Sequence, residues 1–418
     1  MDQTNSKVIW IINHYTTIPL KDGAGNRHFM LAEGLQREGW NPVLFLASTQ
    51  HPAGKQFLKK RTLRFVGTDG GVNFVMLKAN GYKTGWQRLL NMVGFSLGLL
   101  LPTNLRKIER PNVIMGCTVH LLAASAALVL ARRFRVPFVF EVRDIWPETL
   151  VDLGKLSANG VAARVMSMLS KYLYKHADLV VSPLPGVREH LDELGFLDTP
   201  FCWVANGIED MPSAPDDFPD DADTFTFMYL GSHGNANGIK GLLSAFDRAV
   251  SELNGNKKLK LRLVGDGPLK KELRLFAESL PASGSIQFED RISRSDVISR
   301  AREADSLVVN IENLPVYRFG ISLNKLFDYM AAGRPSVIAT NARNNPILES
   351  ESGISVDAGD EAALAKAMRE MSELSADQRA IMGQNGVEHV RLHYSSKALV
   401  KRLLKGLAVV DSGKSYNA

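Results

Sequence analysis

The sequence predicts an α/β protein made of two doubly wound domains. Apolar runs with strand character alternate with helical patterns along most of the chain, and one stretch rich in Pro and Asp, 212–223, interrupts them. Repeated strand, helix, strand units indicate a parallel sheet with helices on both faces. The 418 residues, 45% hydrophobic and 22% charged, are enough for two hydrophobic cores.

The first domain is expected at 1–205. Short apolar runs predict strands at 8–13, 42–47, 113–115, 137–142 and 179–182. Apolar positions three or four apart predict helices at 28–37, 121–133 and 161–176. Residues 206–225 contain the acidic, Pro-rich stretch without an apolar face, which predicts a linker.

The second domain is expected at 226–390, where the alternation starts again. Its predicted strands are 226–230, 259–264, 285–289, 306–310 and 336–339, and its predicted helices include 242–251, 269–279, 296–301 and 324–331. The two domains therefore share one architecture, and further helices follow to the end of the chain.

Charge and cysteine content restrict the function. Residues 1–200 hold 24 Lys and Arg against 15 Asp and Glu, or +9, whereas the rest holds 26 against 29, or −3. The basic excess lacks interleaved aromatic residues, so nucleic-acid binding is not expected. Cys117 and Cys202 are too few for a disulfide framework or a cysteine metal site, and the polar start of the chain predicts no secretion signal. A cytoplasmic protein is expected.

The longest apolar run extends from Leu89 to Leu101 and has basic residues on both sides, among them Arg88 and Arg106. A helix that spans a bilayer needs roughly 20 apolar residues, so this run is too short to cross one. It could lie on an anionic membrane surface, here the inner membrane face, or be a buried core helix. The sequence leaves both interpretations open.

Loops that follow the strands are the candidate site, because ligands of parallel sheets bind beyond the carboxyl ends of the strands. The first such loop contains Gly23 and Gly25 before Asn26, where free amides at a helix start could bind an anion with Arg27 and His28 nearby. The alternative is that the glycines serve only the geometry of the loop.

Arg143 and Asp144 follow the predicted strand 137–142 directly. A charged pair at the end of a central strand must be solvated or paired, and this favours a functional role over a purely structural one.

The stretch 317–337 combines an irregular loop with a helix start. Ser322 or Asn324 is expected to cap a helix on whose first turn Lys325 and Asp328 share a face. A cation and a carboxylate beside free backbone amides suit a nucleotide, with Lys325 on the diphosphate and Asp328 on the ribose. A surface ion pair between Lys325 and Asp328 is the alternative.

These residues resemble a known family. The passages GAGNRHFMLAEGLQREGW, FEVRDIWPETL, VVSPLPGVREHL, ANGIE, FMYLGSHGNANGIKGLLSAF, LRLVGDGPLKKEL and GISLNKLFDYMAAGRPSVIA are similar to those of family 4 glycosyltransferases, in the WbuB-like subgroup of bacterial surface-polysaccharide enzymes. The resemblance implies the GT-B architecture, in which two Rossmann-like domains face a central cleft and a last helix, here 391–418, crosses back to the first domain.

The resemblance also implies a function: retaining transfer of a sugar from a nucleotide-sugar donor, with a UDP-sugar favoured, without a metal ion or other cofactor. A lipid-linked saccharide in O-antigen or other polysaccharide synthesis is the expected acceptor. The donor would bind mainly to the second domain. The residues carried over to donor binding are Gly23, Gly25, Asn26, Gly231, Arg291, Ile292, Ser322, Asn324, Lys325 and Asp328, with the backbone at 291–292 receiving the base.

Some positions depart from the family pattern. The first member of the usual carboxylate pair falls on Gly320, so Glu312, Tyr317 or Arg318 is expected to contact the donor sugar instead. The usual Arg and Lys of the diphosphate site correspond to Ser232 and Asn237.

Arg143 stands where many members have His, which leaves Asp144 as the nearest ionisable group. We therefore expect Asp144, Arg143 and Lys325 to serve the chemistry. Two rival functions remain at this point: a nucleotide-sugar 2-epimerase of the same architecture, and a non-catalytic peripheral membrane component of polysaccharide assembly.

Overall fold

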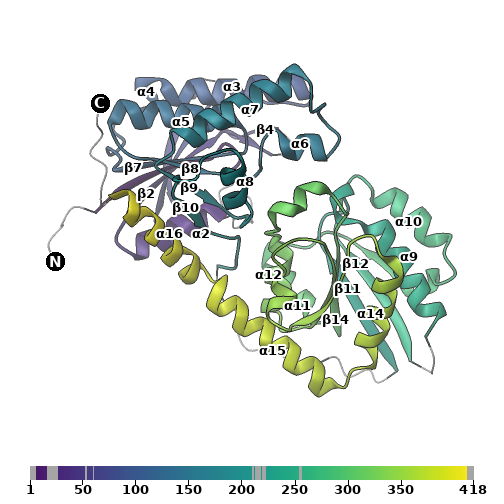
Figure 1. Ribbon diagram of the computed structural model, residues 1–418. Coiled ribbons are helices and arrows are strands. Elements are labelled where there is room, and N and C mark those ends of the chain that lie inside the picture. Colours follow the sequence, from purple (N-terminus) through teal and green to yellow (C-terminus); the bar gives the residue numbers. More distant parts are fainter. Residues whose placement is uncertain are drawn as a thin grey trace. The chain divides into compact units, whose positions relative to one another are not determined.

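The computed structural model describes residues 6–16, 27–51, 54–59, 61–209, 211, 218, 223–253 and 257–411. The chain divides into two compact units, Met1–Ala205 with Ser396–Ala418 and Asn206–Ser395. Each unit is built around a largely parallel sheet with helices on both faces (Figure 1). The predicted α/β class with two doubly wound domains is confirmed.

The sheet of the first unit has the strand order β10-β9-β8-β7-β1-β2-β6-β5. Neighbouring strands are parallel except for the edge pair of β5 and β6. The strands are β1 (Val8–Ile12), β2 (Asn41–Ala47), β5 (Arg64–Asp69), β6 (Val72–Leu77), β7 (Val113–Cys117), β8 (Phe138–Glu141), β9 (Leu179–Ser182) and β10 (Phe201–Trp203). The chain order reverses between β1 and β7, so the loops after these strands are the favoured place for a ligand.

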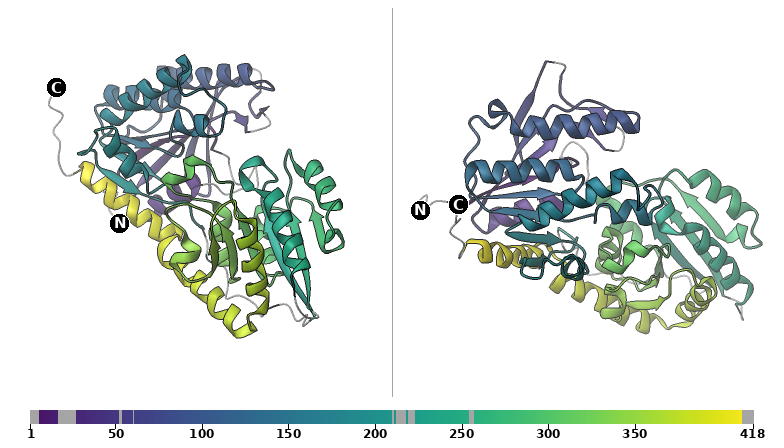
Figure 2. Two further views of the ribbon diagram at one scale, coloured as in Figure 1. Left: turned by 45° about the vertical axis from the view of Figure 1, so that its right-hand side comes forward. Right: turned by 45° about the horizontal axis from the view of Figure 1, so that its top comes forward.

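Helices cover both faces of this sheet. On one face α3 (Gly85–Leu100), α5 (Leu121–Phe134) and α7 (Val161–Lys175) lie side by side, and on the other α2 (Arg27–Arg37) packs against α16 (Ser396–Asp411) (Figures 1 and 2). Gly34 allows α2 to pack closely on α16, because a Cβ at this position would lie 2.3 Å from Cγ2 of Val400. The shorter elements are α4 (Pro102–Leu105), α6 (Glu148–Asp152), α8 (Val187–Glu193) and the antiparallel pair β3 (Thr49–Gln50) and β4 (Lys55–Gln56).

The apolar run from Leu89 to Leu101 forms most of α3, and it is buried on one side only. Phe95 and Leu99 are fully buried, whereas Leu97 and Leu101 are 59% and 52% exposed. Within the described part of the chain, no helix is long and apolar enough to span a membrane. The core-helix interpretation therefore accounts for one face of α3 and leaves the other face unexplained.

The second unit has a fully parallel sheet with the order β13-β12-β11-β14-β15-β16. Its strands are β11 (Thr224–Leu230), β12 (Lys258–Val264), β13 (Ile286–Glu289), β14 (Ser306–Asn310), β15 (Ser336–Ala339) and β16 (Gly353–Val356). One face carries α9 (Ile239–Ser251), α10 (Lys270–Glu278) and α14 (Glu361–Glu373), and the other carries α11 (Val297–Ala301), α12 (Asn324–Ala331), α13 (Pro346–Glu349) and α15 (Ala376–His393).

Several features of the fold differ from the expectations. The edge strands β10 and β16 were not predicted, and only helices were expected after residue 339. The sequence analysis missed the hairpin of β5 and β6, which turns at Gly70 and Gly71, both with positive φ angles. The return to the first unit also begins at Ser396 rather than at residue 391, because α15 packs on α12 within the second unit.

Candidate functional site

The loop between β14 and α12 is held in a fixed path. Gly320 has φ 102°, a conformation that favours glycine. The Asn344 side chain then binds both backbone groups of Ile321, accepting from its N–H and donating to its carbonyl at 2.8 Å each. This clamp sets where α12 begins.

The predicted cap of α12 is wrong. Leu323 occupies the cap position, and no side chain caps the helix. The Ser322 hydroxyl instead accepts a hydrogen bond from the Asn206 backbone N–H at 2.7 Å, and Asn324 is exposed. The amides of the first turn thus have no side-chain cap, as an anion site requires.

Lys325 extends from the first turn of α12 toward the end of β11. Its Nζ donates to the Tyr229 hydroxyl at 2.8 Å and to Oδ1 of Asn237 at 2.6 Å. Both partners are neutral, and among the described residues no carboxylate pairs with this ammonium. Burial lowers the pKa of Lys325 to about 7.

Asp328 is not paired with Lys325, so the surface ion-pair interpretation is wrong. Its buried carboxylate forms a two-point ion pair with Arg294, whose second guanidinium contact spans 2.6 Å to Oδ1. Burial raises the pKa of Asp328, and Arg294 opposes that shift. Arg294 lies in the short 3₁₀ turn Arg294–Asp296, just after Arg291 and Ile292, and the sequence analysis did not single it out.

Glycines bring the loops after β11 and β12 close to Lys325. A Cβ on Gly231 would lie 3.2 Å from Nζ of Lys325, and a Cβ on Gly265 would lie 1.9 Å from the carbonyl oxygen of Gly231. The backbone contact excludes a larger residue at Gly265, whereas a larger residue at Gly231 would have to displace the ends of the Tyr229 and Lys325 side chains. Gly231 is thus next to Lys325, as its proposed role in donor binding requires.

The three candidates for sugar contact lie on the same loop. Glu312 is exposed and lines a pocket of about 270 Å³ together with Asn310 and Lys240. Tyr317 is half-buried, and burial together with the Glu312 charge raises its pKa. Arg318 is exposed and donates to the Pro315 carbonyl at 2.7 Å.

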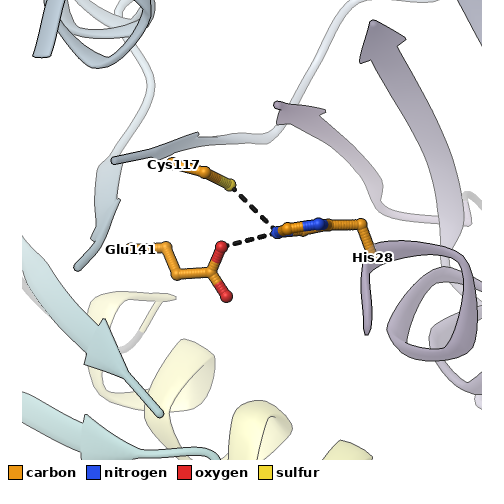
Figure 3. A group of neighbouring side chains, drawn as sticks. All are labelled: His28, Cys117 and Glu141. Carbon is orange, nitrogen blue, oxygen red and sulfur yellow. Dashed lines mark hydrogen bonds and ion pairs between the residues drawn. The ribbon is translucent and has the colours of Figure 1, made fainter. Parts of the chain in front are cut away.

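In the first unit a buried ion-pair group joins α2 to β8 (Figure 3). Nε of Arg27 lies 2.7 Å from Oε1 of Glu141, and Nε2 of His28 lies 2.6 Å from Oε2. The Cys117 thiol is 3.3 Å from the same His28 nitrogen. Arg27 also donates to the Ala205 carbonyl at 2.5 Å. The expected anion site with Arg27 and His28 is therefore wrong, because both side chains point into the core.

This group also contains the three ligand types of a metal site, since His28, Cys117 and Glu141 offer atoms within 4.8 Å of one another. The Arg27 guanidinium, however, holds one carboxylate oxygen, and burial raises the pKa of the Cys117 thiol well above its usual value. A cation would have to displace the guanidinium and ionise the thiol. We therefore assign the group to stability.

Arg143 and Asp144 lie one residue beyond β8 and are anchored through their backbone amides. The amides of both residues donate to the Thr118 hydroxyl, at 2.8 and 3.4 Å. Within the described residues the Arg143 guanidinium has no hydrogen-bond partner, and burial raises the pKa of Asp144 while Arg143 opposes that shift. Gly23, Gly25 and Asn26 lie outside the described residues.

Comparison with known proteins agrees with this division. Residues 22–207 match the model of the glycosyl transferase 4-like domain, and residues 224–373 match that of the glycosyl transferases group 1. A probable glycosyltransferase, WbjE, of Pseudomonas aeruginosa is 24% identical over 304 residues, covering 68% of this chain and 74% of the relative.

Solved structures share the fold over nearly the whole chain. Sucrose-phosphate synthase from Thermosynechococcus elongatus superimposes with a TM-score of 0.72 at 16% identity, covering 98% of this chain and 100% of that one. The lipopolysaccharide outer core galactosyltransferase WaaB gives a TM-score of 0.61 at 14% identity, covering 96% of this chain and 99% of that one. At such identities the likeness concerns the fold alone.

Proposed function

The chain belongs to the glycosyltransferases of the GT-B fold, and we propose that it transfers a sugar from a nucleoside diphosphate to a lipid-linked saccharide in bacterial surface-polysaccharide synthesis, such as that of O-antigen. The transfer is retaining and needs no metal ion. The observation that carries the proposal is Lys325, a partly buried ammonium with neutral partners at the uncapped start of a helix.

The donor diphosphate binds to Lys325 and to the first amides of α12. A diphosphate carries the charge that the neutral partners Tyr229 and Asn237 do not provide. During transfer, negative charge grows on the departing diphosphate, and each preorganised donor directed at it is worth about 3 kcal/mol. Lys325 therefore stabilises the leaving group as well as the bound donor.

The ribose and base occupy the neighbouring surface of the second unit. Asp328 accepts hydrogen bonds from ribose hydroxyls, which requires its pairing with Arg294 to adjust. The backbone at Arg291 and Ile292 receives the base, and UDP-sugars are the first donors to test. Glu312, Tyr317 and Arg318 serve the sugar ring, because Gly320 has no side chain to do so.

In the first unit Asp144 orients the acceptor hydroxyl and Arg143 supplies positive charge. The bond between C1 of the sugar and the phosphate oxygen breaks, and the acceptor oxygen bonds to C1 on the same face. The acceptor proton passes to the leaving phosphate oxygen. Asp144 thus acts on the acceptor without itself taking the proton.

A lipid-linked acceptor requires contact with a membrane surface, and the layer of α3, α5 and α7 suits one. None of these three helices contains Asp or Glu. On α7 an exposed apolar stripe includes Val161 and Met168, 78% and 72% exposed, and α3 exposes Leu97. Lys and Arg residues flank both stripes, and together they favour an anionic inner membrane face.

Vesicle sedimentation tests the membrane surface. We expect Leu97→Glu and Met168→Glu to reduce binding to vesicles that contain anionic lipid at least tenfold. Leu275→Glu is the matched control, because Leu275 is 60% exposed on the second unit. Equal binding by all three variants would refute this part of the proposal.

The transferase activity is tested with a panel of radiolabelled nucleotide-sugars, with and without a bacterial lipid extract. We expect release of nucleoside diphosphate and labelling of lipid only when both are present. Lys325→Ala should weaken donor binding at least tenfold, whereas Lys366→Ala, at an exposed lysine on α14, should leave it unchanged. Conversion of the donor to its 2-epimer without any lipid extract would point to an epimerase instead.

A further inference from the structure

A second polar cluster lies in the first unit, between the residues that follow β1 and the first turn of α3. Tyr15, His51, Tyr82 and Arg88 form it, and the roles proposed so far use none of them. The rings of Tyr15 and His51 are stacked with centroids 4.2 Å apart, and Nδ1 of His51 lies 2.9 Å from the Tyr82 hydroxyl. Tyr15, His51 and Arg88 are each partly exposed. The cluster is therefore reachable from solvent.

Two buried histidines form the base of this cluster. The Ala123 amide donates to Nδ1 of His120, so the proton of neutral His120 is on Nε2. That nitrogen lies 2.6 Å from Nδ1 of His14, which places the His14 proton on its own Nε2, facing Asn91. Burial lowers the pKa of His14, and it lowers that of His120 to about 3, so both rings are neutral.

Arg88 is the single charge in the cluster, and the described residues use little of its hydrogen-bonding capacity. Its Nε donates to the Tyr15 hydroxyl at 2.7 Å, while its terminal nitrogens have no protein acceptor among the described residues. No described carboxylate pairs with it either. Burial lowers the pKa of His51, and the charge of Arg88 lowers it further. A guanidinium whose two terminal nitrogens and charge are unmatched by the described residues fits the geometry of a phosphate.

We propose that Arg88, with Tyr15 and His51 beside it, binds a phosphate group of the acceptor. The inference rests on the proposed function and adds the group by which the acceptor is held. A phosphate offers two oxygens to the terminal guanidinium nitrogens and supplies the counterion that Arg88 does not find among the described residues. The phosphate could belong to a lipid phosphate, a sugar phosphate or free phosphate, and the probes below distinguish these sources.

Binding is measured by calorimetry on the full chain with UDP present at saturation, so that the donor site is filled. The probes are farnesyl diphosphate, N-acetylglucosamine 1-phosphate and inorganic diphosphate, with farnesol as the uncharged reference. We expect at least one phosphate probe to bind and farnesol to bind at least tenfold more weakly. The probe that binds most tightly identifies the source.

Arg88→Gln should weaken the best probe at least tenfold, and Arg88→Lys, which keeps the charge but not the two-nitrogen geometry, should weaken it by less. Arg133→Gln, at an exposed position on α5, is the matched control and should leave binding unchanged. Unaltered UDP affinity and melting temperature show that the variants are folded.

Two results would overturn the proposal: wild-type protein that binds UDP but no phosphate probe, or equal probe affinities in the Arg88→Gln and Arg133→Gln variants. Neither result would contradict the donor site proposed in the second unit. Failure of UDP or nucleotide-sugars to bind at all would instead count against the proposed function.

Discussion

Donor affinity should depend on pH through Lys325. Burial lowers the pKa of this ammonium to about 7 in the donor-free protein, and a bound diphosphate raises it again. Only the protonated form offers a full charge to the diphosphate. Donor affinity is therefore highest below pH 7 and falls as the pH rises above 7, because binding must then take up a proton.

The size of the effect follows from the linkage. Two pH units above the pKa of the free lysine, about one molecule in 100 carries the proton, so affinity at pH 9 should be roughly 100-fold weaker, or about 2.7 kcal/mol. A nucleotide-sugar is the proper ligand, since the terminal phosphate of a free nucleoside diphosphate titrates itself near pH 6. Calorimetry in buffers of different ionisation enthalpy measures the proton uptake directly.

Two variants separate Lys325 from other titrating groups. Lys325→Arg stays charged throughout this range, so its donor affinity should change little between pH 6 and 9. Lys325→Ala should bind weakly at every pH. A wild-type affinity that does not change over this range, or a Lys325→Arg variant with the wild-type slope, would refute the assignment.

Four further predictions follow from the same structure. Lys325→Met should stabilise the protein by up to about 4 kcal/mol near pH 7, as measured by urea unfolding. The reason is that between pH 7 and 10.5 the unfolded wild-type chain binds a proton at Lys325 that the folded chain does not. The stability gain should shrink as the pH rises through that window. Arg294→Ala should cost about 1–2 kcal/mol at pH 7 by leaving Asp328 unpaired, and adding Asp328→Asn should restore part of this, so a double-mutant cycle with no coupling would contradict the ion pair. Glu141→Gln should destabilise the first unit by about 3 kcal/mol at pH 7. The partners of Glu141 hold its pKa well below the usual value, so the difference in stability between wild type and variant should vanish as the pH falls through that lowered pKa. A variant as stable as wild type at pH 7 would refute the stabilising role of the buried ion pairs. Asp144→Asn should lower turnover at least tenfold while leaving nucleotide-sugar affinity unchanged, and near-normal turnover would exclude its role.

The sequence predicts the central strands of both sheets well, because central strands of parallel sheets are continuous apolar runs, but it misses the edge strands β10 and β16. β14 and β15 lie at the predicted residues, and the ends of β1 and β12 differ by one residue. The edge hairpin of β5 and β6 escaped notice since β5 is largely exposed and lacks such a run. Its Asp69-Gly70-Gly71 turn was the available signal.

The candidate site was less predictable, because its contacts join residues far apart in the chain. Lys325 and Asp328 could be found from their places on a helix start, but their partners could not. Arg294 sits in a polar loop without a pattern, 34 residues before Asp328. The pairing of Glu141 was easier to predict, because a carboxylate at the end of the apolar strand Phe138–Glu141 must have a partner when buried.

The hydrogen-bond and ion-pair partners of the cationic side chains distinguish structural cations from candidate functional ones. Arg27 and Arg334 are buried, and their guanidinium groups bind protein acceptors: Glu141 and a backbone carbonyl for Arg27, and the carbonyls of Arg302 and Ala304 for Arg334. Lys325 and Arg88 differ, because each is partly exposed, has neutral partners and meets no described carboxylate. A folded protein gains nothing from an uncompensated, partly desolvated charge. A bound anion would supply the missing counterion at each position, a diphosphate at Lys325 and a phosphate at Arg88.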